Sequence, residues 1–463
     1  MTPQPIAAAL TPAQRTRQHR AWYVYDWANS GYWTVTATVL IAPYLISIAT
    51  RAACGDLAEG QTCRETLSVA GIPVAPGSLP GYTVALGTIL AFFALPIVGA
   101  LADRSPAPKR ILGWLAGIGS TAASLMFFVA GTNWQFGVVL LIIANVCLAL
   151  AQAVYDGILV QISLPDERDR VSSRGWALGY LAGFLLLAAC MGLLTGADAG
   201  LFGLDTTMAV RLSMLGAGLW WGIFSIYPVV ALWNRPVPAG RAATSISGTV
   251  RTSFGQLAST VKHLRGYRQT WMFLLAYLVF NDGIQTVITS SSTYASGELG
   301  FDSSQLVQVI LLVQFVAFVG ALVFGRLAVI IGSVRTIFCG LAGWLVVIVA
   351  AYLAPQGRFL IFVVIAIGIG LVMGGTQALA RSVYSQLIPA GREAEYFSLY
   401  QAGERGTSWL GSLVFALMFQ ITGSYRPALI SLMLFFLIGA ILLSRVRVAE
   451  GIRAVGNVVP DKL

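Results

Sequence analysis

Charged residues, histidines and cysteines are scarce in this sequence, and each shortage excludes a class of protein. Asp, Glu, Lys and Arg make up 10% of the 463 residues, whereas soluble proteins carry about 25%, so a set of soluble domains is excluded. The two histidines lie far apart, which leaves no Cys/His spacing typical of a metal site. Five cysteines are too few for a disulfide-dense scaffold. With no phosphate-binding loop and no catalytic constellation, the sequence predicts neither an enzyme nor a bound cofactor.

Long apolar runs are what the sequence has instead. Hydrophobic residues make up 57% of the chain, and about 20 consecutive apolar residues cross a bilayer. We therefore predict an all-α membrane protein with twelve transmembrane helices. The predicted spans lie near residues 22–49, 81–102, 111–131, 134–157, 174–196, 207–233, 270–294, 304–326, 335–354, 359–381, 396–421 and 426–445.

The basic residues are distributed unevenly between the two sides of this arrangement. An even number of spans places the terminal segments 1–21 and 446–463 on one side of the membrane. Arg405 lies within a span, and 23 of the other 28 Lys and Arg residues fall on that same side. The exceptions are Arg51, Arg64, Arg211, Arg358 and Arg426. The positive-inside rule then predicts a bacterial inner-membrane protein with both termini in the cytoplasm. Topology explains the net charge of +10, so no nucleic-acid partner is predicted.

The spans divide into two halves joined by a linker. We predict six-helix bundles at 22–233 and 270–445, separated by a cytoplasmic linker at 234–269 that contains a basic amphipathic helix. Leu-Pro-Asp-Glu-Arg-Asp at 164–169 aligns with Ile-Pro-Ala-Gly-Arg-Glu at 388–393, in the loop between the fourth and fifth helices of each half. Repeated halves with a site between them are typical of transporters.

Two of the cysteines lie in the first predicted outside loop. Cys54 and Cys63 are nine residues apart there, and a disulfide between them is predicted if the loop faces an oxidising compartment. Two unpaired thiols are the alternative. Cys147, Cys190 and Cys339 lie in predicted spans and are interpreted as packing residues.

Several motifs resemble one transporter family. Gly-Ala-Leu-Ala-Asp-Arg at 99–104, followed by Lys-Arg, is similar to the signature loop of the major facilitator superfamily, although Pro106 and Pro108 depart from its pattern. Tyr-Asp-Trp-Ala-Asn-Ser at 25–30 and Asn-Asp-Gly-Ile-Gln-Thr at 281–286 resemble the vacuole-effluxer-like branch of that superfamily, which includes fungal vacuolar amino-acid exporters.

This resemblance implies two six-helix bundles that rock about a central site. It also implies alternating access, export of a small solute such as a neutral amino acid, and a monomer. Asp103 and Arg104 would then serve the cytoplasmic gate. Ordinary loop charge is the alternative for these two residues.

Ionisable and polar groups inside the spans are candidates for substrate or proton binding. Asp282 lies near the middle of the seventh span, where it could exchange a proton or bind a substrate ammonium group, with Asn281 and Gln285 beside it. A structural carboxyl bonded to a neighbouring helix is the alternative. Asp26 and Asn29 share one face of the first span and are interpreted as gating or coupling residues. The alternative is that Asp26 is a carboxylate near the N-terminus of a helix, where the helix dipole favours it.

Glu404 and Arg405 are adjacent in the eleventh span, so they point about 100° apart and each needs another partner. Asp26, Asp156 and Asp282 are the candidate partners of Arg405. The alternatives are a gating pair, a substrate-carboxylate site at Arg405, and a static interhelical ion pair.

The remaining candidates lie in other spans. Asp156 is expected to pair with Arg174 or with loop cations in a gating role. Tyr32 and Trp33 lie deep enough in the first span to line a cavity, and Gln377 of the tenth span joins the predicted substrate-binding group.

The sequence therefore predicts a secondary active transporter that exports a small solute, with proton coupling through Asp282. A transporter of an amphiphile, peptide or sugar is the alternative. A membrane receptor without transport activity, or a membrane-embedded enzyme, is the more distant one.

Overall fold

The computed structural model describes residues 6–55, 63–69, 71–234 and 266–463. The described chain is helical apart from one short hairpin. Most of the predicted linker at 234–269, including its amphipathic helix, lies outside the described residues.

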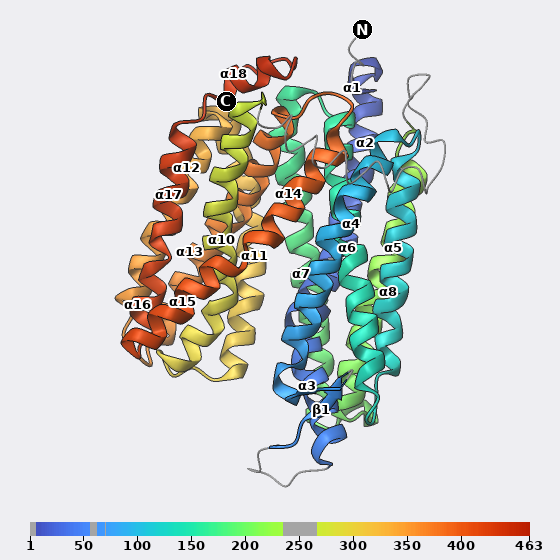
Figure 1. Cartoon of the computed structure of the whole chain (residues 1–463), viewed down its shortest axis with the longest axis vertical. Coiled ribbons are helices and arrows are strands. Elements are labelled where there is room, and N and C mark those ends of the chain that lie inside the picture. Colours follow the sequence, from blue (N-terminus) through green and yellow to red (C-terminus); the bar gives the residue numbers. More distant parts are fainter. Residues whose placement is uncertain (1–5, 56–62, 70, 235–265) are drawn as a thin grey trace.

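The first group of helices forms one bundle of the molecule (Figure 1). Its helices are α1 (Ile6–Ala9), α2 (Pro12–Tyr32), α3 (Ile41–Cys54), α4 (Leu79–Arg104), α5 (Pro108–Leu125), α6 (Trp134–Ile162), α7 (Arg168–Asp198) and α8 (Thr206–Ala231). Short 3₁₀ turns lie at η2 (Pro76–Ser78), η3 (Met126–Phe128), η4 (Pro165–Glu167) and η5 (Leu201–Gly203).

The second group forms the other bundle. Its helices are α10 (Arg268–Gly297), α11 (Ser303–Ile331), α12 (Ser333–Tyr352), α13 (Phe359–Gln386), α14 (Glu393–Thr407), α15 (Trp409–Thr422), α16 (Tyr425–Ser431), α17 (Met433–Ser444) and α18 (Val448–Ala454). Helices α1 and α18 lie at the same end of the molecule, which we call the proximal end, and the hairpin lies at the distal end (Figure 1).

Several helices begin where a polar side chain accepts a free backbone N–H group of the first turn. Thr11 and Gln14 form a capping box at the start of α2. Asp205 accepts the N–H of Met208 at 2.7 Å and begins α8. Asp302 accepts the N–H of Gln305 at 2.9 Å and begins α11. Two of these caps therefore lie in loops of the distal end.

Apolar side chains cover the outer faces of the bundles. Trp114, Val230 and Leu360 are exposed by 74%, 73% and 76% respectively, and many other large apolar residues are exposed beside them. Apolar surface of this extent does not persist in water, and it fits contact with lipid. The chain is therefore a multi-pass integral membrane protein. Each bundle also has its own hydrophobic core.

Among the described residues, eleven helical segments are long and apolar enough to cross a membrane. The predicted eleventh span at 396–421 is the one missing from that count, because Ser408 divides it into α14 and α15, of 15 and 14 residues. Together α14 and α15 descend obliquely from the proximal towards the distal end (Figure 1). A broken helix at membrane depth is a common feature of transporter sites.

The first span contains a second irregularity. A π-helix, η1 (Trp33–Leu40), separates α2 from α3, and the Ile41 N–H bonds to the carbonyl of Thr36, five residues back. Single π-helical turns often occur at functional sites.

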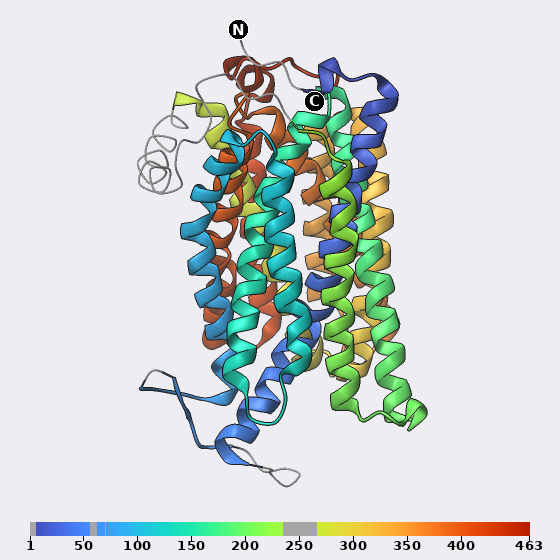
Figure 2. The same cartoon turned by 90° about the vertical axis from the view of Figure 1, so that its right-hand side faces the viewer.

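The distal end carries a small covalently closed loop. The structure joins Cys54 to Cys63 by a disulfide bond. Strands β1 (Leu67–Val69) and β2 (Ile72–Val74) follow it as an antiparallel hairpin in which Leu67 pairs with Val74. Figure 2 shows the hairpin at the distal end, to one side of the helices.

Candidate functional site

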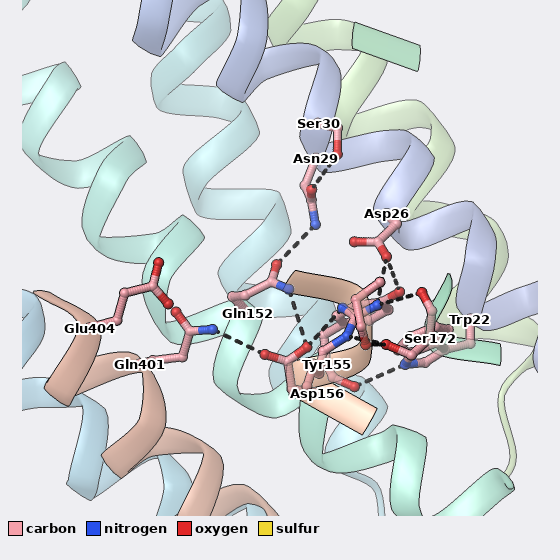
Figure 3. Close-up of polar contacts among 12 residues, drawn as sticks. Trp22, Asp26, Asn29, Ser30, Gln152, Tyr155, Asp156, Ser172, Gln401 and Glu404 are labelled. Carbon is pink, nitrogen blue, oxygen red and sulfur yellow. Dashed lines mark hydrogen bonds and ion pairs between the residues drawn. The ribbon is translucent and has the colours of Figure 1, made fainter. Parts of the chain in front are cut away.

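A cluster of three charged side chains lies between the two bundles, closer to the proximal end. The guanidinium of Arg381 on α13 contacts two carboxylates of the first bundle. Its Nη1 lies 3.1 Å from Oδ1 of Asp156 on α6, and its Nη2 lies 3.5 Å from Oδ2 of Asp26 on α2. The three residues are 2%, 0% and 6% exposed. Figure 3 shows the two carboxylates converging from different helices.

Aromatic rings and a serine hold the guanidinium in place. The Arg381 Cζ atom lies 4.9 Å from the ring centroid of Trp22 and 5.4 Å from that of Trp176. Arg381 Nε and Nη2 donate to the hydroxyl and the carbonyl of Ser172, both at 3.0 Å. Arginine combines planar donors with stacking on aromatic faces, which lysine cannot reproduce. The site is therefore shaped for arginine.

Neutral donors complete the coordination of the two carboxylates. The Tyr155 hydroxyl donates to Asp26 Oδ2 at 2.7 Å. The side-chain amides of Gln401 and Gln152 donate to Asp156 at 3.1 and 3.3 Å. Both oxygens of Asp156 and Oδ2 of Asp26 therefore have hydrogen-bond partners, as buried charges require.

A glycine allows α2 and α7 to approach closely at this site. A Cβ atom on Gly175 would lie 2.6 Å from Oδ2 of Asp26 and 2.6 Å from the ring of Trp22. Gly179 and Gly183 meet the hydroxyl groups of Ser30 and Thr34 in the same way, one turn apart. These glycines permit close packing of α7 against the first span.

Bonds between the bundles continue to the proximal end. Arg168 on α7 donates to the Ser385 carbonyl at 2.9 Å and to Gln386 Oε1 at 3.0 Å. The Asp103 carboxylate accepts the N–H groups of Ala394 and Glu395, at 3.0 and 2.8 Å, in the first turn of α14. The positive end of the helix dipole favours a carboxylate there.

Helix α14 is packed on the first bundle, although it belongs to the second in sequence. Gly99 of α4 and Gly157 of α6 allow the contact, since a Cβ on either would lie within 3.0 Å of α14 atoms. Leu95, Leu150 and Ala402 form a small apolar cluster in the same interface. The bundles are therefore closed against each other at the proximal end, and Figure 1 shows them diverging towards the distal end.

A second polar group surrounds the break between α14 and α15. Glu404 accepts from the Tyr277 hydroxyl at 3.0 Å and from Gln285 Nε2 at 3.1 Å. Arg405 Nη1 donates to Gln401 Oε1 at 2.8 Å on its own helix. Both Glu404 and Arg405 are partly exposed. Within the described part of the chain, neither has a salt bridge, so each can accept an outside partner.

Gln401 connects the two polar groups. Its side-chain oxygen accepts from Arg405, and its nitrogen donates to Asp156. A movement of Arg405 would therefore disturb the bond to the buried carboxylate.

Asp282 lies apart from the three-charge cluster, at the start of α15. Its Oδ2 accepts the N–H of Gly411 at 2.8 Å, so it caps the outer part of the broken helix from α10. Its Oδ1 is buried and has no hydrogen-bond partner among the described residues. Thr286, one turn along α10, packs against Gly411.

The other predicted polar residues occupy separate places. Gln377 donates to Asn281 Oδ1 at 3.2 Å and accepts from the Tyr180 hydroxyl at 3.1 Å, which joins the bundles again. Tyr32 is fully buried, and its hydroxyl donates to Asn145 Oδ1 at 3.0 Å. Trp33, the first residue of η1, is 54% exposed.

Asn29, Arg104 and Arg174 complete the predicted set. Asn29 donates to Gln152 at 3.3 Å and so joins the outer side of the three-charge cluster. Arg104 is partly buried at the end of α4, and Arg174 is exposed on α7.

The structure pairs Asp26 and Asp156 with Arg381, rather than with Arg174 or Arg405, the predicted partners. Sequence reasoning missed Arg381 because it is the last residue of the predicted tenth span, where a basic residue normally marks the membrane border. Helix α13 in fact continues to Gln386. The signal available was the run of polar residues from Gln377 onward, which extends the helix beyond its apolar part.

Among the residues that the structure describes, no group of three or more His, Cys, Asp and Glu side chains could hold a metal ion. The chemistry of the site therefore rests on the carboxylates, guanidinium groups and amides described above.

Comparison with known proteins identifies the group to which this arrangement belongs. The family model described as vacuole effluxer Atg22 like matches residues 14–456. The chain is 29% identical to the uncharacterized MFS-type transporter YxiO of Bacillus subtilis, over 93% of this chain and 94% of that protein. It is 25% identical to autophagy-related protein 22 of Yarrowia lipolytica, over 77% and 73% of the two chains.

Solved structures share the fold. The human organic anion transporter MFSD10 superposes with a TM-score of 0.66 at 13% identity, covering 94% of this chain and 100% of that one. The proton:xylose symporter XylE superposes with a TM-score of 0.65 at 13% identity, covering 96% and 98%. At this identity the likeness concerns the fold alone.

Proposed function

The chain belongs to the Atg22-like vacuole effluxer family of major facilitator transporters, and we propose that it exports a small zwitterionic solute by proton-coupled alternating access. A neutral amino acid is the proposed solute. Membership of this family makes the protein a transporter rather than an enzyme.

The observation that carries the substrate proposal is the pair Glu404 and Arg405. The two side chains carry opposite charges, are partly exposed, and lie at the break between α14 and α15. A free amino acid carries an ammonium and a carboxylate group a few ångströms apart, which matches a carboxylate and a guanidinium from adjacent residues. An amphiphile would require Arg405 to be neutralised by an ion pair. Arg405 instead donates to Gln401, which favours the zwitterion.

The break in the eleventh span supports this location. At the break, the Trp409 indole donates to the Gly406 carbonyl at 2.8 Å, and Asp282 accepts the N–H of Gly411. Side chains therefore satisfy backbone groups that a continuous helix would pair internally. Asp282 acts in this proposal as a positioning residue for α15, beside any part it has in proton exchange.

Both termini are proposed to be cytoplasmic, which makes the proximal end the inner face of a bacterial plasma membrane. The distribution of Lys and Arg supports this orientation. The structure then corresponds to the state in which the inner face is closed. The Cys54–Cys63 disulfide would lie on the oxidising outer side. We propose a monomer as the functional unit.

Uptake into proteoliposomes tests the proposal. A mixture of labelled neutral amino acids is offered with and without an imposed proton gradient. The expected result is accumulation that collapses when the gradient is dissipated, and that falls at least tenfold in Glu404→Gln and Arg405→Gln. Glu450→Gln is the matched control because it removes a carboxylate at an exposed surface pair with Arg447. Absence of uptake by folded protein in either condition refutes the amino-acid assignment.

A further inference from the structure

We propose that the cluster of Asp26, Asp156 and Arg381 is the proton-exchange site of the transport cycle, at which a proton and the guanidinium compete for the two carboxylates. This inference rests on the proposed function, and it assigns coupling to these residues rather than to Asp282. The proximal closure is then the step that proton binding controls.

The charge balance of the cluster is the first argument. Two carboxylates surround one guanidinium, and all three groups are more than nine-tenths buried. With every group ionised, the site holds one uncompensated negative charge. A buried charge of this kind is normally removed by taking up a proton. The closed state therefore holds one proton shared between Asp26 and Asp156.

Among the residues that the structure describes, no other cation forms an ion pair with either carboxylate. The groups that face the carboxylates from the surrounding helices are the phenols of Tyr25, Tyr155, Tyr180 and Tyr400 and the amides of Gln152 and Gln401. These groups are neutral. Arg405 is near enough to Asp156 to interact with it electrostatically, but hydrogen bonds connect the two only through Gln401, and Glu404 beside Arg405 carries the opposite charge.

The origin of the three residues is the second argument. Both carboxylates belong to the first bundle, on α2 and α6, whereas Arg381 belongs to the second, on α13. Separation of the bundles at the proximal end must therefore withdraw Arg381 from both carboxylates. The carboxylates, now without their cation, hold a second proton, which reaches them from the distal side and competes with Arg381. That proton leaves to the proximal side before Arg381 returns and the bundles close.

The connection to the substrate site is the third argument. Gln401 bonds both to Arg405 and to Asp156. A substrate carboxylate that draws Arg405 away would release the amide of Gln401 from its present bonds. Substrate binding and proton binding are thereby linked through one side chain.

The proton dependence of the proximal closure can be measured without any substrate. Spin labels at Arg110→Cys on α5 and Arg335→Cys on α12 mark exposed positions at the proximal end of each bundle. They are placed in a background in which the three free cysteines are serine. Because the open state binds one more proton, the ratio of open to closed populations should rise by up to roughly tenfold for each unit of pH decrease.

The decisive variant removes the charges together. Asp26→Asn, Asp156→Asn and Arg381→Met in one chain leave a neutral cluster, which avoids the unpaired buried charge that a single change at Arg381 would create. Its open-to-closed ratio should be independent of pH, whereas Glu450→Gln should behave as the parent does. A parent ratio that does not change with pH, or a neutral variant that keeps the parent's slope, overturns the proposal.

Infrared difference spectra test the shared proton separately and need only a conservative single change. The parent spectrum minus that of Asp156→Asn should contain the carbonyl band of one protonated carboxyl group. A difference that contains only ionised carboxylate bands overturns the shared proton.

These measurements separate the two levels of the argument. If amino acids are not transported, the distance and infrared results still stand or fall by themselves. If uptake is driven by the proton gradient and the neutral variant still accumulates substrate against it, this inference fails while the proposed function stands.

Discussion

Asp103 offers a quantitative test of what holds the proximal end closed. Its carboxylate accepts two N–H groups of α14, from Ala394 and Glu395, at 3.0 and 2.8 Å. A hydrogen bond to a charged group contributes about 1.5 kcal/mol or more to stability. Two such bonds give about 3 kcal/mol, which corresponds to roughly a 150-fold change in an equilibrium constant. Asp103→Ala should therefore raise the ratio of open to closed molecules by about two orders of magnitude.

Alkylation of a buried position measures this ratio. Ser173 on α7 is 1% exposed and packs against Gly325 of α11, across the same closure but away from α14. In Ser173→Cys, with the free cysteines replaced, a thiol reagent should react only when the bundles separate. The modification rate should rise by about 100-fold on adding Asp103→Ala, as long as the closed state still predominates.

The matched control is Asp302→Ala, which also removes a carboxylate that caps a helix. Asp302 begins α11 at the distal end, and the hydrogen bonds of its carboxylate within the described part of the chain are to Ser304 and Gln305 of the same helix. The modification rate of Cys at 173 should therefore stay within about twofold. An increase of less than about threefold for Asp103→Ala would refute the idea that these two bonds hold the closure.

Three further predictions concern the second bundle. Gly411→Ala should lower the thermal stability of the purified protein by several degrees in a melting assay, because its Cβ would lie 2.2 Å from the Thr286 hydroxyl; an unchanged midpoint would argue against this close contact. Asp282→Asn should keep most of the free energy of unfolding, because the amide oxygen of Asn can still accept the N–H of Gly411. Asp282→Leu should lower that free energy by about 1 to 3 kcal/mol. Equal losses in the two variants would show that the cap is unimportant. The pKa of Asp302 lies below its ordinary value because the N–H of Gln305 donates to its carboxylate. The stabilisation from this cap should therefore be complete above the ordinary carboxyl pKa and should disappear as the pH falls through the lowered pKa of Asp302. A pH titration by NMR that follows the chemical shift of the Asp302 carboxyl carbon measures this change.

The helical membrane fold could be predicted because its cause is local. Apolar runs long enough to span a bilayer recur along the whole chain, and a spanning segment must pair its backbone groups internally, which favours a helix. The division of the eleventh span was harder to foresee. Glu404 and Arg405 place two charges inside the predicted eleventh span, but the end of α14 depends on Gly406, Ser408 and the cap from Asp282 on another helix.

The candidate site could be predicted only in part. Asp26 and Asp156 were found because a carboxylate in an apolar run is costly and so suggests a role. Their pairing with Arg381 depends on how the two bundles pack, and the spacing of residues within one span contains no information on that. Asp282 was found by the same reasoning, but its contact with Gly411 assigns it a structural task that the sequence left as an alternative.

The π-helix at Trp33–Leu40 has a consequence for how relatives should be aligned with this chain. A π-helical turn contains more residues than an α-helical turn of similar height. A relative with a regular α-helix here would cover the same length with fewer residues between Tyr32 and Ile41. A short gap in an alignment at this place would therefore record a change in helical winding, while the inner and outer parts of the span keep facing the same neighbours.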